Sequence, residues 1–167
     1  RKWHSNILRS HLGPTLYFLN LNSVEDIKLT REKVRAEMAR HYSLNTKEKW
    51  LLHPGLLTGG KGLDFMTKLA PIISSNRRLL IMGGYGPKQK DRTFALEALE
   101  KIERAMPGRV SFIESPTDDD FKAMLLAADL LLLPYDVGLS ERRSSFLSAM
   151  TCAANVWTTI GEYSEPL

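Results

Sequence analysis

The sequence has little that would staple the chain covalently or carry it into a membrane. Its single cysteine, Cys152, excludes an internal disulfide and fits a reducing compartment. No apolar run is long enough to span a bilayer, and no signal peptide is visible. The longest apolar stretch, 130–133 with its alanine-rich approach, is a buried strand by its length. These absences predict a cytoplasmic location.

Common metal and nucleotide motifs are missing as well. The four histidines are scattered without metal-ligand spacing, so we expect no metal site and no cofactor. No G-x-G-x-x-G lies between the first expected strand and its helix, which argues against NAD. The Walker pattern fails because Gly62 follows Lys61, where that pattern has Ser or Thr. His53, at a strand end, could meet a substrate, but packing or capping is the more common role of such a histidine.

What is present is an ordinary globular composition, 43% apolar and 25% charged, with an uneven charge distribution. Residues 1–49 hold ten Lys/Arg and five Asp/Glu, although the net charge of the whole chain is only +4. A basic lead-in favours contact with an anionic membrane surface, here the inner face, or with nucleic acid. The alternative is a solvated linker and helix face. Aromatic and basic residues do not interleave, so we expect no nucleic-acid partner.

From Lys49 onward, short apolar segments alternate with amphipathic ones. The expected strands are 49–52, 78–82, 109–113, 129–133 and 155–159. The expected helices are 30–41, one that follows Lys61 and is kinked or ended by Pro71, 91–106, one that begins at Thr117 with Phe121 on its apolar face, and 140–153. The run LYFLNL at 16–21 suggests a further short strand. Since the strands are apolar without clean alternation, both faces of the sheet should be covered. The pattern predicts an α/β fold with a doubly wound, Rossmann-like parallel sheet at 46–167, preceded by a lead-in segment at 1–45 that carries one amphipathic helix.

Ligands of such sheets bind at the carboxyl ends of the strands, here the loops 55–61, 83–88, 114–117 and 135–145. In the first loop Gly59 and Gly60 precede Lys61, and a helix follows. Glycines let an anion approach the backbone, and the free N–H groups of a helix start attract it. Lys61 adds a full charge, so this loop favours phosphate binding. The alternative is a sharp turn with a solvated lysine.

The fourth loop holds two adjacent arginines, Arg142 and Arg143, at an expected helix start. Arginine binds phosphate through a planar, two-pronged donor. Two arginines in a first helical turn oppose the helix dipole unless an anion is bound there. The alternative is that one arginine points to solvent and the other pairs with Glu141 or Asp136. Together with Lys61, the arginines favour an anion the size of a diphosphate.

Five motifs occur in an order that resembles the C-terminal half of GT-B glycosyltransferases. The resemblance is strongest to the large retaining family 4, the glycosyl transferases group 1 domain, and covers about residues 48–165. In this sequence the motifs read GLLTGGKGLD at 55–64, GYGP at 84–87, VSF at 110–112, AD to Pro at 128–134, and SAMTCAANV at 148–156.

The resemblance implies a nucleoside-diphosphate sugar as donor substrate. Lys61 matches the lysine that holds the diphosphate, and the main chain near Ile113 would meet the base. The implied catalytic set is Lys61, Arg142 and Arg143, and the implied donor-binding set is Gly59, Gly60, Gly84, Gly86, Ile113, Glu114, Ser140, Ser144 and Ser148.

The sequence also departs from the family pattern. Leu56 stands where the family often has arginine, and Ser140 and Ser148 stand where it often has two glutamates eight residues apart. Ala153 and Asn155 replace the usual glycine and proline. The run SERRSS at 140–145 looks like the S-x-R-R-x-S of one branch of the family, in which the arginines take over anion binding.

These observations predict the donor half of a retaining, metal-independent, hexosyltransferase-type enzyme. It would transfer a sugar to a glycan, a lipid or a small molecule. Because the chain starts at Arg1 without methionine, we expect a fragment that lacks the N-terminal, acceptor-binding half and is inactive alone. The alternative is a degenerate, non-catalytic glycosyltransferase-like interaction module. A third interpretation, a GT-B sugar epimerase, needs catalytic carboxylates that we cannot place.

Overall fold

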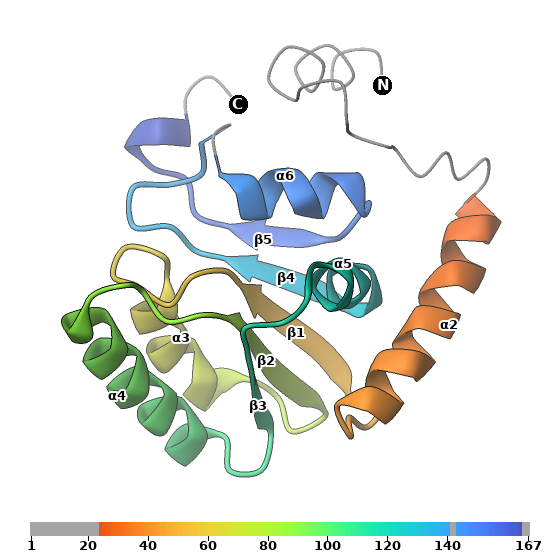
Figure 1. Ribbon diagram of the computed structural model, residues 1–167, viewed down its shortest axis with the longest axis horizontal. Helices are drawn as coiled ribbons and strands as arrows, with labels where there is room; N and C mark the ends of the chain where they lie inside the picture. Colours follow the sequence, from red (N-terminus) through yellow and green to blue (C-terminus); the bar gives the residue numbers. More distant parts are fainter. Residues whose placement is uncertain (1–23, 141–142, 165–167) are drawn as a thin grey trace.

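The strands assemble into one five-stranded, wholly parallel sheet in the order β3-β2-β1-β4-β5 (Figure 1). The computed structural model describes residues 24–140 and 143–164. The strands are β1 (Lys49–Pro54), β2 (Arg77–Gly83), β3 (Val110–Glu114), β4 (Leu130–Leu133) and β5 (Val156–Thr158). The helices are α2 (Val24–His41), α3 (Leu63–Leu69), α4 (Gln89–Ala105), α5 (Asp118–Ala127) and α6 (Ser144–Thr151), with 3-10 turns η1 (Ala70–Ile72) and η2 (Glu162–Ser164). The predicted α/β, doubly wound fold is confirmed.

Both faces of the sheet are covered, which explains the apolar strands. Successive side chains of a strand point to opposite faces. Trp50 and Leu52 therefore join the core cluster beneath α2, α5 and α6, whereas Leu51 joins the cluster beneath α3 and α4. Trp50 and Leu52 are completely buried.

The chain reverses its direction across the sheet at β1. β1 pairs with β2 on one side and with β4 on the other. In Figure 1 the strand arrows point toward the loops between α3 and α6. In doubly wound sheets the crevice outside the carboxyl ends of two such strands is where ligands bind. A ligand is therefore expected at the loops after β1 and β4.

Two helix starts differ from the predictions. α2 begins at Val24 rather than Thr30. α6 begins at Ser144 rather than Ser140, because Leu139 donates its N–H to the carbonyl of Thr159 instead of entering a helix. The strand suggested by LYFLNL at 16–21 lies outside the described residues.

Two local predictions are confirmed. α3 ends at Leu69 and continues as a 3-10 turn that contains Pro71, the residue expected to end its regular part. Thr117 caps α5, since its side-chain oxygen accepts the N–H of Asp120 at 3.1 Å.

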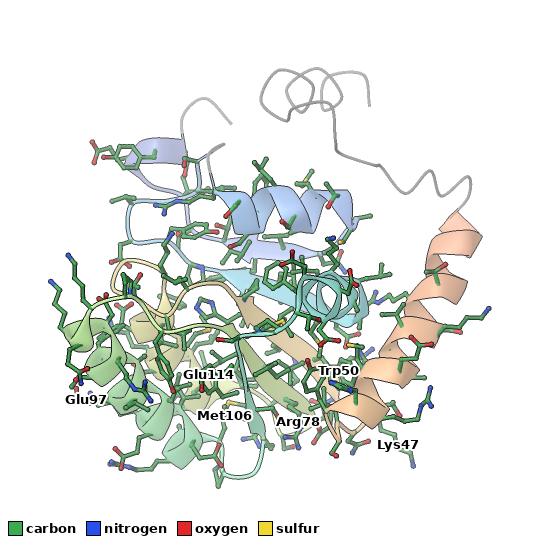
Figure 2. All side chains as sticks on the ribbon, in the orientation of Figure 1. Lys47, Trp50, Arg78, Glu97, Met106 and Glu114 are labelled. Carbon is green, nitrogen blue, oxygen red and sulfur yellow. The ribbon has the colours of Figure 1, made fainter. Side chains whose placement is uncertain are left out.

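A cluster of paired charges holds α2 at the amino end of the sheet. The Asp129 carboxylate contacts Arg31, Arg35 and Lys49 and accepts the backbone N–H of Trp50 at 2.8 Å. The Arg35 guanidinium also lies 3.9 Å above the Trp50 ring. Figure 2 shows Trp50 beside the lower end of α2. Two cations of the basic lead-in are thus directed inward.

Within 24–140 and 143–164, no helix has both the length and the apolar character needed to cross a membrane.

Candidate functional site

A pocket of about 240 Å³ opens where the loops after β1 and β4 meet the start of α6. It therefore lies at the carboxyl ends of the two strands that flank the point of reversal, as the topology predicts. Its lining residues are Pro54, Gly55, Leu56, Lys61, Phe121, Tyr135, Ser144, Ser145 and Ser148.

Gly62 lets the loop that carries Lys61 lie directly on the end of β4. Its φ is +86°, and a Cβ at this position would lie 1.9 Å from the Pro134 carbonyl oxygen. Only glycine fits both the left-handed conformation and this close approach. The contact fixes where the loop can pass, and thereby places Lys61 on the pocket wall.

A second cation, Arg143, lies near enough to Lys61 to act on its charge. The pKa of Lys61 lies below the ordinary lysine value, first because of burial and second because of the nearby Arg143 charge. Both effects disfavour the protonated form. An anion between the two cations would reverse the second effect, so the site is electrostatically prepared for negative charge.

α6 directs its first turn at the same pocket. Ser144, Ser145 and Ser148 line it from this helix, and Arg143 is the N-cap residue. The first N–H groups of a helix have no partner inside the helix and carry partial positive charge. Arg143 therefore precedes the first turn instead of occupying it.

No carboxylate lines the pocket among the described residues. In that same part of the chain no ion pair joins Arg143 to Asp136, the partner proposed for it from the sequence. Arg143 instead lies over the Tyr135 ring, 4.5 Å from its centre. Arg142 and Glu141 lie outside the described residues.

The structure brings together only part of the predicted catalytic and donor-binding sets. Lys61, Ser144 and Ser148 line the pocket, and Arg143 stands beside it. The remaining described members lie outside the lining, namely Gly59, Gly60, Gly84, Gly86, Ile113, Glu114 and Ser140.

Two of these residues, Gly84 and Gly86, lie at a junction between two loops. The loops after β1 and β2 join through a bridge between Leu57 and Tyr85. Gly86 lies against this junction, since a Cβ there would be 2.4 Å from Thr58 and 2.6 Å from Asp91. Gly84 contributes its carbonyl, which accepts the Leu57 N–H at 2.9 Å. The glycine-containing loop after β2 thus supports the loop after β1, which carries Lys61.

His53 is a core residue and does not line the pocket. It is 2% exposed, and its Nδ1–H donates to the Leu132 carbonyl at 2.9 Å. Burial lowers its pKa, more than the hydrogen bond and the charge of Asp64 raise it. We infer a neutral ring that ties β1 to β4. Within the described residues no group of three His, Cys, Asp or Glu side chains is arranged to hold a metal ion.

Three of the lining side chains had no predicted catalytic or donor-binding role, namely Phe121, Tyr135 and Ser145. Tyr135 and Ser145 lie at the two ends of the loop 135–145, which was expected to face a ligand, so their position was a usable signal. Phe121 was expected only on the buried face of its helix. Its contribution depends on how α5 sits beside β1, which local sequence does not reveal.

No protein-family model matches this sequence, and no curated protein matches it either. Several solved structures share its fold. HepE of Anabaena, solved in complex with UDP and glucose, superimposes with a TM-score of 0.65 at 16% identity over 79% of this chain. Sucrose-phosphate synthase of Thermosynechococcus elongatus gives 0.64 at 20% identity over 75%. The C-terminal domain of the glycosyl transferase group 1 protein LpcC of Francisella tularensis gives 0.61 at 17% identity over 79%.

The matched part amounts to 34% of the HepE chain, 31% of the synthase and 68% of the LpcC domain. The chain thus spans about one third of the length of the two complete enzymes. At these identities the comparisons establish the fold, which is that of the C-terminal domain of GT-B glycosyltransferases.

Proposed function

We propose that this chain is the donor-binding domain of a glycosyltransferase that uses a nucleoside-diphosphate sugar. The observation that carries the proposal is the pocket itself, in which Lys61, Arg143 and the first turn of α6 converge at the carboxyl ends of β1 and β4. The fold supports it, as does the complex of UDP and glucose reported for HepE.

The diphosphate is the part of the donor that this pocket suits best. Its charges would lie between Lys61 and Arg143, and its oxygens would accept the N–H groups at the start of α6. Hydroxyls of Ser144 and Ser148 offer further donors. Complete small-molecule sites enclose roughly 300–1,000 Å³, more than this pocket. We therefore expect the base or the sugar to extend toward a second, acceptor-binding domain.

The same residues would assist the chemistry. When the bond between the sugar carbon and the phosphate oxygen breaks, its electron pair stays on the leaving diphosphate. The growing negative charge would be stabilised by Lys61 and Arg143, which are already in place. Because protein cations supply the stabilising positive charge, we propose that the transfer needs no metal ion. We also propose that it proceeds with retention at the sugar carbon. The acceptor would be a glycan, a lipid or a small molecule.

Titration calorimetry of the chain against UDP, GDP, ADP and their sugar conjugates tests the proposal. We expect binding that weakens by about tenfold to a hundredfold in Lys61→Ala, because a charge-assisted contact to phosphate is lost. Lys68→Ala is the matched control, since Lys68 is an exposed lysine at the far end of α3. Unchanged binding in Lys61→Ala would exclude Lys61 as a phosphate ligand.

The second candidate is a non-catalytic module with this fold. It is favoured by the lining itself, where Ser148 stands in a glutamate position of the family and no carboxylate is found among the described residues. A well-folded sample that binds none of the nucleotides would support this candidate. For a chain that binds donor, the configuration of the product sugar, read by NMR in a protein with both domains, tests retention.

A further inference from the structure

Tyr135 occupies a position that none of the predicted roles explains. It follows Pro134 directly after β4 and is only 4% exposed, yet it lines the pocket. Its ring belongs to a small core cluster with Leu133 and Leu139, against which Phe146 packs. The side chain thus lies between the sheet and α6, at the place where that helix starts.

The Tyr135 hydroxyl is buried without a hydrogen-bond partner among the described residues. Burial raises its pKa, so it keeps its proton. Ser145 lies near enough to favour the ionised phenol slightly, but no contact to the phenol oxygen has hydrogen-bond geometry. Buried hydroxyls are normally paired, and an unpaired one lowers stability. This hydroxyl therefore calls for an explanation.

Ser145 stands between this hydroxyl and the backbone at the pocket wall. Its Oγ is 3.3 Å from the point where a side chain on Gly55 would begin. A serine hydroxyl both donates and accepts, and it can turn about its Cα–Cβ bond. In one rotamer the Ser145 hydroxyl could accept a hydrogen bond from Tyr135 while it donates its own hydrogen into the pocket.

We propose that Tyr135 is a positioning residue for the bound diphosphate and acts through Ser145. In the liganded protein the Tyr135 O–H donates to Ser145 Oγ, and the Ser145 O–H donates to a phosphate oxygen. The ring of Tyr135 meanwhile holds the Arg143 guanidinium, 4.5 Å from its centre, beside the same anion. This inference rests on the proposed function, because it needs an anion in the pocket.

The proposal predicts opposite effects on stability and on binding for one substitution. Tyr135→Phe keeps the ring and the stacked Arg143 but removes a hydroxyl that has no hydrogen-bond partner in the described part of the unliganded chain. We expect an unchanged or higher thermal midpoint without ligand, and UDP binding that is about fivefold to tenfold weaker. A purely structural hydroxyl would give the reverse, a lower midpoint with unchanged affinity.

A double-mutant cycle tests the route through Ser145. Tyr135→Phe, Ser145→Ala and the double variant should weaken UDP binding to a similar extent, because each interrupts the same chain of hydrogen bonds. Tyr42→Phe is the control; this tyrosine directly follows α2, near Asp120, and is not among the lining residues, so the loss of its hydroxyl should leave affinity unchanged. Fully additive losses would show that Tyr135 does not act through Ser145 and would overturn the proposal.

The failure of this inference can be told apart from that of the proposed function. If UDP binds, weakens in Lys61→Ala and is unaffected by Tyr135→Phe, the donor site stands and the role of Tyr135 is rejected. If the wild-type chain binds none of UDP, GDP and ADP, the proposed function fails and the inference fails with it. If the midpoint of Tyr135→Phe falls, the hydroxyl is structural and the inference is wrong.

Discussion

The two edges of the sheet treat charge in opposite ways. At the amino edge Asp129 is surrounded by three cations and a backbone N–H, and Arg78 pairs with Glu48 at 2.6 Å. At the carboxyl edge Lys61 and Arg143 lie near each other, and no carboxylate is among the described lining residues of the pocket.

The pKa values express this contrast. Burial raises the pKa of Asp129, but the Trp50 N–H and the charges of Arg35 and Lys49 outweigh it, so the pKa is lowered and the carboxylate is kept charged. For Lys61 burial and Arg143 act in the same direction, against the charged form. Charges that are satisfied within the chain stabilise the fold. Charges left unsatisfied indicate where an external partner is needed. Four substitutions or conditions test this division between the amino and carboxyl edges of the sheet.

The largest effect is expected from Gly62→Ala. A Cβ in the left-handed conformation, pressed against the Pro134 carbonyl, should lower the free energy of unfolding by roughly 3–4 kcal/mol. The loop must shift to relieve the contact, so nucleotide binding should weaken as well. Urea unfolding and calorimetry measure the two effects.

Gly59→Ala is the matched control for stability, because a Cβ there meets nothing within 4 Å and the φ of Gly59 is not positive. Equal destabilisation by the two variants would show that Gly62 is not the point at which the loop is fixed.

Asp129→Ala should lower the free energy of unfolding by roughly 2–3 kcal/mol, because Arg31 and Arg35 lose their carboxylate and the Trp50 N–H loses its acceptor. Nucleotide affinity should stay unchanged, since the cluster lies at the opposite edge of the sheet. Asp129→Asn, which keeps an oxygen for the Trp50 N–H, should be less damaging. A large loss of affinity in either folded variant would contradict the division between the edges.

Nucleotide binding should weaken as the pH rises, and should begin to do so below the ordinary lysine pKa of 10.5. The sign follows because the protonated form of Lys61 binds phosphate and its pKa in the free protein is lowered. Above the pKa of Lys61 in the free protein, affinity should fall by up to about tenfold per pH unit.

Calorimetry in matched buffers measures this dependence on pH. Lys61→Arg is the control, since arginine keeps its charge and its binding should be flat. A wild-type profile as flat as that of Lys61→Arg would mean that the charge of Lys61 makes no contribution.

The smallest effect should come from Ala153→Gly, and it should be stabilising. Ala153 follows the end of α6 with a φ of +49°, a conformation that costs an L-residue about 1–2 kcal/mol. After the greater freedom of glycine in the unfolded chain is subtracted, we expect a gain of about 0.5–1 kcal/mol in urea unfolding. Ala123→Gly, inside α5, should instead destabilise by about 0.5–1 kcal/mol.

Most of the fold was accessible from the sequence, because local chemistry marks its boundaries. Thr117, Pro71 and the apolar strands each predicted an element that the structure contains. The start of α6 was predicted four residues early, since the bond from Leu139 to Thr159 joins residues that are distant in sequence. No local pattern announces such a bond.

For the site, the sequence indicated the loops and the lysine but not how the loops pack. Gly84 and Gly86 match a donor turn in sequence, yet Gly86 lies against Thr58 and Asp91 behind the pocket. Tyr135 reads as an ordinary residue after a strand and becomes part of the wall only once α6 is laid across it. Contacts between loops are set by the sheet order and not by spacing along the chain.

By itself, then, the sequence determined the alternation of strands and helices, the glycine-rich turn and the positions of the cations along the chain. Propensity, periodicity and turn chemistry act over a few residues, so they can be read locally. The tertiary structure decided which of these cations are neutralised and which face a pocket. Arg31 and Arg35 belong to a basic lead-in, yet both contact Asp129, whereas Lys61 and Arg143 lie at a pocket that no carboxylate lines among the described residues. The energy of a charge depends on its neighbours in space, and those neighbours come from strands far apart in the chain.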